Sequence, residues 1–382
     1  MLEQKQIRQI AIVTPKNIAQ QAKPFWQTCT SIARSMNIVL SGHPLWFEIP
    51  DARVTSFTSV IERDIYPKRP DICIIMIPKH DEEMYAALKK LMCIKCPMLS
   101  QIITAQKVLN KPDKAKSFAT KILVQMATKL GAKPWGLKIP PKNVMVAGFD
   151  TYHKKDGDRR GKSFGAFTAS LDPLFGRYFS QSLSHTAGEE ISQNIAQMFA
   201  GALRAYQNAN QGAFPTRIFF YRDGVGEGQL LEVRETEIKA VKDVIAATGQ
   251  DIKLTFIIVS KRINTRFFTT DPGNIRNPPS GTVVDDVATL PERYDFYLIS
   301  QSVGQGTVNP TSYNVILDES GWTPDKIQVL TYKLTHLYYN WPGTVRVPAP
   351  CMYSHKLADL VGSKLKEEVN QELTNQNVLY YL

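Results

Sequence analysis

The sequence predicts an α/β protein in which a domain with a mainly parallel sheet is followed by a domain with a mixed sheet. Short apolar runs at 10–14 and 72–77 are each followed by a proline, which is typical of buried strands in a parallel sheet. An apolar run at 144–149 precedes a run at 163–170 that alternates with period two, which indicates a hairpin. Because this hairpin precedes crossover connections, we expect both strand orientations in the second sheet.

Strands and helices alternate in the first domain. After the two apolar strands, Pro112 and Asp113 open a long helix over 114–130. Gly131 follows directly and is a typical helix stop. Three prolines then lie close together at 134, 140 and 141, which is typical of a domain boundary. We therefore predict one domain over residues 1–140 and a second over residues 141–382.

The second domain continues the alternation after its hairpin, whose two strands are joined by a glycine-rich, charged loop at 154–162. The apolar spacing of 189–206 predicts a helix, and 217–221 reads as another buried strand. The remaining expected elements are a helix near 229–247, strands at 253–259 and 294–300, and two final helices at about 323–339 and 352–369.

The composition is that of a folded protein without a membrane span. Of the 382 residues 43% are apolar, which is enough for sizeable cores. The longest uninterrupted apolar run, 72–77, is far shorter than the roughly 18 residues that a membrane helix needs, and the N-terminal residues lack the apolar core of a signal peptide. Five cysteines, an odd number, fit a reducing compartment better than a disulfide framework. We expect a cytoplasmic location.

The positive charge is concentrated in one segment. Residues 84–149 hold 12 Lys and Arg against a single acidic residue, Asp113, so this segment carries +11, which equals the net charge of the whole chain. A solvated surface would intersperse both signs. The segment therefore predicts a binding site for a polyanion, with nucleic acid or phosphate as the natural partner.

Two aspartates come at the ends of core strands of the second domain. Asp150 follows the apolar run 144–149, and Asp223 follows the strand at 217–221 after one arginine. Strand ends are where α/β folds place their chemistry. If the two strands are neighbours, the carboxylates converge and repel each other unless a divalent metal joins them. Taken singly, an aspartate at the end of a strand is more often only a turn or cap residue, so neither one alone indicates a site.

Several long motifs of the chain closely resemble the PIWI domain of Argonaute proteins. They occupy 219–229, which contains Tyr-Arg-Asp-Gly-Val, and 279–285, 294–301 and 340–358. The run Tyr-Asn-Trp-Pro-Gly at 339–343 and the ending Leu-Tyr-Tyr-Leu at 379–382 resemble the Piwi clade. The resemblance covers essentially the whole chain, and its motifs are long and in order.

The resemblance implies a Rossmann-like MID domain over 1–140, which binds the 5′ end of a guide, and an RNase H-like PIWI nuclease domain over 141–382. Family members also carry N-terminal and PAZ domains, so we expect the chain to be the MID–PIWI half of a longer protein. The implied function is that of a slicer in piRNA-type silencing, which binds a 5′-phosphorylated small guide RNA and cleaves complementary target RNA.

Two other functions stay open. The first is a non-cleaving module that loads guide RNA and recruits silencing-complex proteins, which are expected partners in either case. The second is an RNase H-like DNA nuclease, which rests on fold analogy alone. The resemblance adds germ granules and the nucleus to the cytoplasm as expected locations.

The family's catalytic residues carry over one at a time. Asp150 matches the first aspartate, Asp223 matches the second, within Tyr-Arg-Asp-Gly-Val, and His355 matches the histidine after Pro-Ala-Pro. The fourth residue is a glutamate on the intervening helix, and Glu190 matches it best. Glu189 stays as the alternative, because neighbouring positions of a helix point about 100° apart and only one can face the site.

These residue types suit divalent metal ions. Carboxylate oxygens and one imidazole fit two Mg²⁺ or Mn²⁺ ions about 4 Å apart, which promote in-line cleavage of a phosphodiester. The resemblance implies that Asp150 bridges both ions, that Asp223 and His355 complete the ligand set, and that the glutamate orders a water molecule there. His153 and His185 are the weaker alternatives to His355.

A second site is implied in the first domain. Tyr85 and Lys89 share one helical face at a spacing of four residues, and the family's pocket uses such a pair to stack on the first guide base and to bind its phosphate. Three polar residues of the next helix also share a face, although a solvated surface is the alternative there. The full set implied for the 5′ phosphate is Tyr85, Lys89, Gln101, Lys121, Gln125, Lys129 and Leu382.

Gln125 departs from the Argonaute-clade pattern, which has a lysine at this position. One fixed positive charge is therefore missing from the pocket. In Piwi-like proteins a divalent cation bridges the phosphate, this glutamine and the chain's own C-terminal carboxylate, which here would belong to Leu382. We therefore expect the apolar ending at 378–382 to be buried, against the usual behaviour of chain termini.

Overall fold

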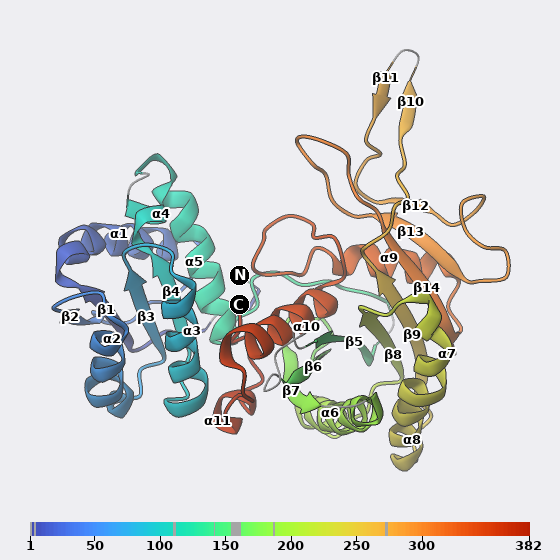
Figure 1. Ribbon diagram of the computed structural model, residues 1–382, viewed down its shortest axis with the longest axis horizontal. Helices are drawn as coiled ribbons and strands as arrows, with labels where there is room; N and C mark the ends of the chain where they lie inside the picture. The colour runs from blue at the N-terminus through green and yellow to red at the C-terminus, as the bar shows by residue number, and fades with distance from the viewer. Residues whose placement is uncertain are drawn as a thin grey trace. The chain divides into compact units, whose positions relative to one another are not determined.

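The computed structural model describes residues 2–3, 5–109, 112–140, 142–153, 162–185, 188–271 and 274–382 (Figure 1). The chain divides into two compact units, the first made of 1–135 with 360–382 and the second of 136–359. The first unit gives way to the second between Trp135 and Gly136, close to the predicted boundary at 140. The segment 360–382, which the sequence analysis assigned to the second domain, packs with the first unit instead. The assignment of functions to the two domains stays a prediction.

The first unit contains a four-stranded sheet in the order β2-β1-β3-β4. Every neighbouring pair is parallel, which confirms the prediction of a parallel sheet. Both apolar runs named in the sequence analysis are central strands, buried at every position because helices cover both faces. The strands are β1 (Ile10–Pro15), β2 (Leu45–Ile49), β3 (Ile72–Ile77) and β4 (Ser100–Thr104).

Helices cover both faces of this sheet (Figure 1). Helices α2 and α3 pack on one face, where alternate residues of β1 and β3 meet Phe57 and Leu88. Helix α1 packs against α4 and α5. The long helix predicted over 114–130 is α5 with a short 3₁₀ turn before it. The helices are α1 (Lys16–Ser35), α2 (Val54–Val60), α3 (Glu82–Lys90), α4 (Ala105–Leu109) and α5 (Ala115–Lys129).

The C-terminal segment completes the first unit. A π-helical turn (Leu360–Leu365) packs on α3, and the short helix α11 (Gln371–Thr374) follows. Asn370 fastens the segment, because its backbone N–H and its side chain donate to the carbonyls of Cys93 and Ile94, both at 3.0 Å. Residues 379–382 are all buried and Val378 is half-buried, so the expected burial of the apolar ending is confirmed for its last four residues.

The second unit contains an eight-stranded mixed sheet in the order β12-β13-β14-β9-β8-β5-β6-β7. Strands β5, β8 and β9 are parallel neighbours, and the other pairs are antiparallel. The predicted hairpin is β5–β6. The strands are β5 (Val144–Tyr152), β6 (Ser163–Ser170), β7 (Tyr178–His185), β8 (Arg217–Asp223), β9 (Lys253–Ser260), β12 (Thr282–Val284), β13 (Asp295–Ile299) and β14 (Thr311–Asp318), with a separate hairpin of β10 (Thr269–Asp271) and β11 (Asn274–Arg276).

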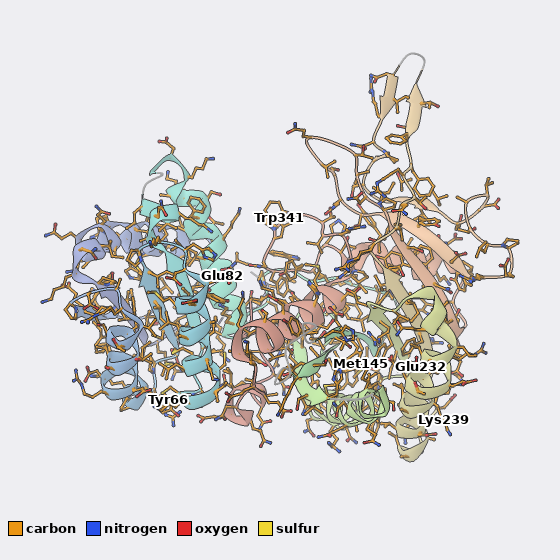
Figure 2. All side chains as sticks on the ribbon, viewed as in Figure 1. Tyr66, Glu82, Met145, Glu232, Lys239 and Trp341 are labelled. Atoms are coloured by element: carbon orange, nitrogen blue, oxygen red, sulfur yellow. The ribbon has the colours of Figure 1, made fainter. Side chains whose placement is uncertain are left out.

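Helices also lie on both faces of the mixed sheet. Helices α6 (Gly188–Ala209) and α8 (Lys239–Ala247) bury apolar side chains against one face, and the short α7 (Leu230–Val233) leads into α8. Helices α9 (Pro324–Leu334) and α10 (Ala349–Asp359) belong to the other face. Figure 2 shows Glu232 and Lys239 on the outer side of α7 and α8, where both are exposed.

Three predicted helices of this unit differ from the structure in their ends. The helix expected near 229–247 is interrupted by a π-helical turn (Arg234–Ile238) between α7 and α8. The helix expected at 323–339 ends earlier, at Leu334, and the one expected at 352–369 begins with α10 and passes into the π-helical turn that joins the first unit. Within the described residues, no helix is both long enough and apolar enough to cross a membrane.

Candidate functional site

Asp150 and Asp223 come from neighbouring parallel strands. Strand β5 pairs with β8 so that Phe149 lies opposite Arg222, which places the two aspartates at the next position of each strand. Both strands run in the same direction, and their carboxyl ends therefore meet at one edge of the sheet. The expectation that the two side chains converge is met for this geometric reason.

His355 reaches the same edge from helix α10. This helix lies against β5 because Gly148 has no side chain, and a Cβ atom there would lie 2.3 Å from the carbonyl oxygen of Pro350. The same carbonyl accepts a hydrogen bond of 2.9 Å from Thr168 on β6. The start of α10 is therefore held directly on the hairpin, and the helix then carries His355 to the aspartates.

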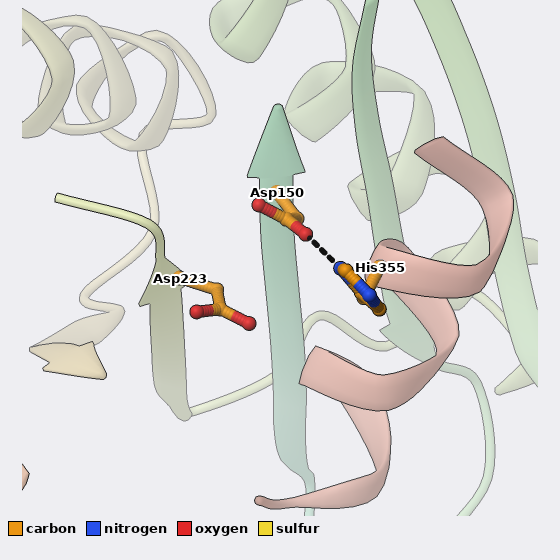
Figure 3. Close-up of side chains that lie close together, drawn as sticks. All are labelled: Asp150, Asp223 and His355. Carbon is orange, nitrogen blue, oxygen red and sulfur yellow. Dashed lines mark hydrogen bonds and ion pairs between the residues drawn. The ribbon is translucent and has the colours of Figure 1, made fainter. Parts of the chain in front are cut away.

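The three side chains form one compact group (Figure 3). A ring nitrogen of His355 and one oxygen of each carboxylate lie within 4.8 Å of one another. His355 Nδ1 lies 2.6 Å from Asp150 Oδ2, and the ring nitrogen is the donor because an ionised carboxylate only accepts. Asp223 is 1% exposed and Asp150 is 7% exposed. The imidazole of His355 is 53% exposed, so a substrate can reach the group from that side.

Burial and mutual charge affect the two carboxyl groups differently. Burial raises the pKa of Asp150, but the hydrogen bond from His355 and the nearby positive charges of His355 and Lys261 outweigh it, so that this pKa lies below its ordinary value. Burial and the negative charge of Asp150 raise the pKa of Asp223, and the ammonium of Lys261 offsets them only in part. The pKa values of the two neighbouring carboxyl groups are therefore shifted in opposite directions.

Lys261 belongs to this group although the sequence analysis did not single it out. Its Nζ atom lies 2.5 Å from Asp223 Oδ2. It follows the last residue of β9, the strand that pairs with β8 on the side away from β5. The rule that drew attention to Asp150 and Asp223, that chemistry gathers where parallel strands end, would also have found Lys261.

The group fits a divalent cation. Two carboxylate oxygens and one imidazole nitrogen are ligands that Mg²⁺ and Mn²⁺ accept. Two buried carboxylates this close repel each other, and burial together with the negative charge of Asp150 keeps the pKa of Asp223 above its ordinary value despite the ammonium of Lys261. The residues present therefore match the ions that the sequence analysis expected, with Asp150, Asp223 and His355 as the side chains that would hold them.

The remaining predicted residues of this site have different outcomes. Glu190 and its alternative Glu189 lie at the start of α6, and their side chains are outside the described residues. His153 and His185 are described, and neither belongs to the group formed by His355 and the aspartates. The choice of His355 over these two histidines therefore agrees with the geometry, whereas the choice between the glutamates stays a prediction.

A model of the Piwi domain matches residues 72–366 of the chain. The chain belongs to the Piwi family. It is 42% identical to Protein aubergine of Drosophila melanogaster, in an alignment that covers 100% of this chain and 44% of that protein. It is 44% identical to Piwi-like protein Siwi of Bombyx mori, with 85% of this chain and 36% of that protein covered.

The structural comparison agrees. The crystal structure of Drosophila Piwi matches with a TM-score of 0.91 and 37% identity, over 100% of this chain and 52% of that chain. The resemblance to the Piwi clade and the predicted fold class are thereby confirmed, including the RNase H-like fold of the second unit. The chain spans less than half the length of aubergine and Siwi and about half of the Drosophila Piwi chain.

In this Piwi-family chain, four of the residues predicted to bind the guide end form a hydrogen-bonded group, which we call the basic cluster: Lys89, Gln101, Gln125 and Lys129, joined through Ser100. Lys89 Nζ donates to the Ser100 hydroxyl at 3.1 Å, and Lys129 Nζ donates to the Ser100 carbonyl and to Gln101 Oε1, both at 2.9 Å. The Gln101 amide in turn donates to Gln125 Oε1 at 3.1 Å. Three elements of the first unit, α3, β4 and α5, thus meet at one polar centre.

The basic cluster is a buried one. Lys89 is 2% exposed and Lys129 is 1% exposed. Burial lowers the pKa of Lys89, because an ammonium loses its hydration there. An anion beside the cluster would compensate for that loss. The sequence analysis did not foresee Ser100, whose hydroxyl and carbonyl serve both lysines, although it comes directly before Gln101.

The other predicted residues of the guide end lie in the same unit. Tyr85 is half-buried on α3, one turn before Lys89, and Lys121 is half-buried on α5, one turn before Gln125. Leu382 is buried at the end of the C-terminal segment. Their roles in binding a guide phosphate stay predictions.

Proposed function

We propose that this chain binds a 5′-phosphorylated small guide RNA and, with divalent metal, cleaves RNA complementary to that guide. The observation that carries the proposal is the convergence of Asp150, Asp223 and His355 at one sheet edge. Separate elements contribute the three side chains, and a structural role alone does not require two buried carboxylates to approach each other. Membership of the Piwi family supports the same proposal.

The chain's own residues would bind and orient the reacting groups. Asp150, Asp223 and His355 would hold Mg²⁺ or Mn²⁺, and Glu190 would order a water molecule beside them. The ions, when bound, supply Lewis-acid activation of water and stabilise charge on the leaving oxygen. The ammonium of Lys261 contacts the carboxylate of Asp223. It is therefore placed to pair with a phosphate oxygen of the RNA strand that enters the site.

The basic cluster would bind the 5′ phosphate of the guide. Lys89, Lys129 and Gln101 are donors that suit the 5′ phosphate, and Lys121 adds a charge on the same helix as Gln125. Tyr85 would stack on the first base. The amide oxygen of Gln125 and the C-terminal carboxylate of Leu382 would hold a divalent cation at the phosphate, since both supply oxygen ligands of the kind that Mg²⁺ prefers.

A second function is favoured by the basic cluster alone. The cluster is formed within the first unit and needs no catalytic residue, so a chain that only loads guide RNA and recruits silencing-complex proteins would use it equally. Under either function, the proposed locations are the cytoplasm, germ granules and the nucleus.

Cleavage of a matched target distinguishes these functions. The chain is loaded with a guide RNA of defined sequence and incubated with Mg²⁺ and a labelled complementary RNA. A slicer yields one cut at a fixed distance from the guide's 5′ end, and the cut disappears with EDTA and in Asp223→Asn. Tight guide binding with no cut in Mg²⁺ or Mn²⁺ would favour the binding module, and a cut in complementary DNA alone would favour the DNA nuclease.

A further inference from the structure

A buried ion pair lies directly beside the candidate active site. Arg222 on β8 and Glu237 in the π-helical turn before α8 are 6% and 5% exposed. The guanidinium binds the carboxylate in bidentate fashion, with Nε donating to Oε2 at 2.8 Å and Nη2 donating to Oε1 at 3.0 Å. The function proposed above does not use this pair.

The pair contacts both strands that carry the aspartates. Arg222 Nη1 donates to the backbone carbonyl of Asp223 at 2.5 Å. The guanidinium carbon also lies 4.8 Å from the ring centroid of Phe149, the residue before Asp150 and the cross-strand partner of Arg222. One side chain thus bonds the backbone at one aspartate and packs beside the other.

Strand periodicity places the pair behind the carboxylates. Successive side chains of a strand point to opposite faces, so Arg222 and Phe149 lie on one face of the sheet and the two aspartates on the other. The face of Arg222 is the one covered by α6 and α8, because its neighbour in alternation, Phe220, belongs to that core. Arg222 therefore cannot be a direct ligand of an ion or of RNA at the carboxylates.

Glu237 is buried within the π-helical turn between α7 and α8. Residues flanking this turn, such as Glu232 and Lys239, are exposed on the outer side of α7 and α8 (Figure 2). A π-helical turn holds one residue more than an α-helical turn and is often found at functional sites. In this turn Arg234, Glu235 and Thr236 are exposed, whereas Glu237 and Ile238 are buried, so that Glu237 meets Arg222.

We infer that Arg222 and Glu237 are positioning residues, which fix the separation of the Asp150 and Asp223 carboxylates and so determine how tightly the site binds a divalent ion. This inference rests on the proposed function. Two adjacent carboxylates repel each other, so without a rigid backbone they would spread apart when no ion is bound. Arg222 opposes this movement through its guanidinium, which binds the backbone of β8 at Asp223, the carboxylate of Glu237 before α8 and the ring of Phe149 on β5. Glu237 neutralises the guanidinium, which would otherwise compete with the ion for the two negative charges.

Direct binding of Mn²⁺ to the full 382-residue chain tests the inference. Titration calorimetry or electron paramagnetic resonance of Mn²⁺ gives the number of Mn²⁺ sites. The site that is lost in Asp223→Asn is the one under test. Glu237→Gln and Arg222→Lys are compared with Ile238→Val, which removes one methyl group from the same turn and keeps both charges. Mutation of a residue that orients metal ligands typically lowers metal affinity by about 10- to 100-fold. We therefore expect the Mn²⁺ dissociation constant of that site to rise at least about tenfold in Glu237→Gln. The rise in Arg222→Lys should be smaller.

The controls separate a positioning role from a loss of fold. Binding of 5′-phosphorylated guide should stay within about twofold in all variants, and Ile238→Val should bind Mn²⁺ as the unaltered chain does. Wild-type Mn²⁺ affinity in a folded Glu237→Gln would overturn the inference. If Glu237→Gln does not fold, Arg222→Lys decides, since it keeps the charge and loses the bidentate contact: an Mn²⁺ affinity equal to that of the unaltered chain would then overturn the inference. If the unaltered chain has no Mn²⁺ site that Asp223→Asn removes, the proposed function fails rather than the positioning role.

Discussion

His355 Nδ1 lies 2.6 Å from Asp150 Oδ2, although 205 positions of the chain separate the two residues. The contact depends on how closely α10 approaches β5. Gly148, two residues before Asp150, leaves room for the carbonyl of Pro350, and Thr168 anchors the same carbonyl from β6. The geometry of the candidate active site is therefore set by a backbone contact one helical turn away from the histidine.

We expect Gly148→Ala to disrupt the site without altering any of its side chains. The added Cβ would lie 2.3 Å from the Pro350 carbonyl oxygen and 2.8 Å from the Cys351 nitrogen, and backbone atoms cannot rotate away. Forced overpacking of this kind costs about 1–3 kcal/mol, so thermal unfolding should occur at a lower temperature and cleavage should fall. Gly304→Ala is the matched control, because nothing lies within 4 Å of its Cβ position. Equal unfolding temperatures for the two variants would contradict the account.

Asp150→Asn and Asp223→Asn should each abolish cleavage and leave guide affinity nearly unchanged. Asparagine keeps the shape of the side chain but removes the charge that holds a divalent ion. The basic cluster is formed by other residues of the other unit, and guide affinity comes chiefly from phosphate contacts. Single-turnover cleavage and filter binding with the same guide measure the two quantities. Cleavage by either variant at a rate near that of the unaltered chain would show that the metal assignment is wrong.

The adjacent glutamates at the start of α6 should behave differently. Neighbouring helical positions point about 100° apart, so one side chain can face the aspartates while the other cannot. We expect Glu190→Gln to reduce turnover strongly and Glu189→Gln to leave it nearly intact, with guide affinity equal in both. The opposite result would move the assignment by one residue and leave the mechanism in place.

The sequence was sufficient to predict those features that depend on local pattern. Alternation and apolar runs located β1, β3, β5, β6 and β8, and the strand-end rule together with the resemblance located both aspartates. Strand β7 was not foreseen, because polar serines interrupt its apolar positions. Strand β4 was not foreseen either, because it is partly polar: it supplies Ser100 and Gln101 to the basic cluster.

Contacts between distant segments were harder to predict. No local pattern indicates that the whole segment 360–382 packs with the first unit, and the resemblance pointed only to its last residue, Leu382. The packing depends on Asn370 meeting the carbonyls at Cys93 and Ile94. The pairing of Arg222 with Glu237 depends on a π-helical turn, and helical periodicity treats 229–247 as one uninterrupted helix. In both cases the deciding interaction is tertiary and overrides the local preference.

Phosphate recognition should weaken as the pH rises. Burial lowers the pKa of Lys89 from its ordinary value of 10.5, so between the lowered value and 10.5 the folded chain holds fewer protons than the unfolded chain. In that window the free protein gains stability as the pH rises. A bound phosphate dianion favours the ammonium, so binding takes up a proton and affinity for a 5′-phosphorylated guide falls through the same window. Lys89→Met should remove the pH dependence, whereas 5′-hydroxyl guide should show little of it in the unaltered chain.

The absence of a lysine at position 125 should make guide-end recognition depend on divalent metal. Gln125 lies in the basic cluster with Lys129 and Gln101 but adds no charge, and Leu382 supplies a carboxylate from a buried chain end of the same unit. On an Asp223→Asn background, which prevents cleavage, we expect EDTA to reduce the preference for 5′-phosphorylated over 5′-hydroxyl guide. A charge-assisted hydrogen bond contributes about 1.5–3 kcal/mol, so the preference should fall roughly ten- to a hundredfold.

Two further variants separate the bridging ion from a general effect of EDTA. A short extension after Leu382 moves the carboxylate away and should mimic EDTA in the presence of Mg²⁺. Gln125→Lys supplies the missing fixed charge and should restore the phosphate preference in EDTA, because an ammonium can replace the ion at the phosphate. A preference that stays unchanged both in EDTA and in the extended chain would show that no ion bridges the guide end, and the lysines of the basic cluster would then account for phosphate binding.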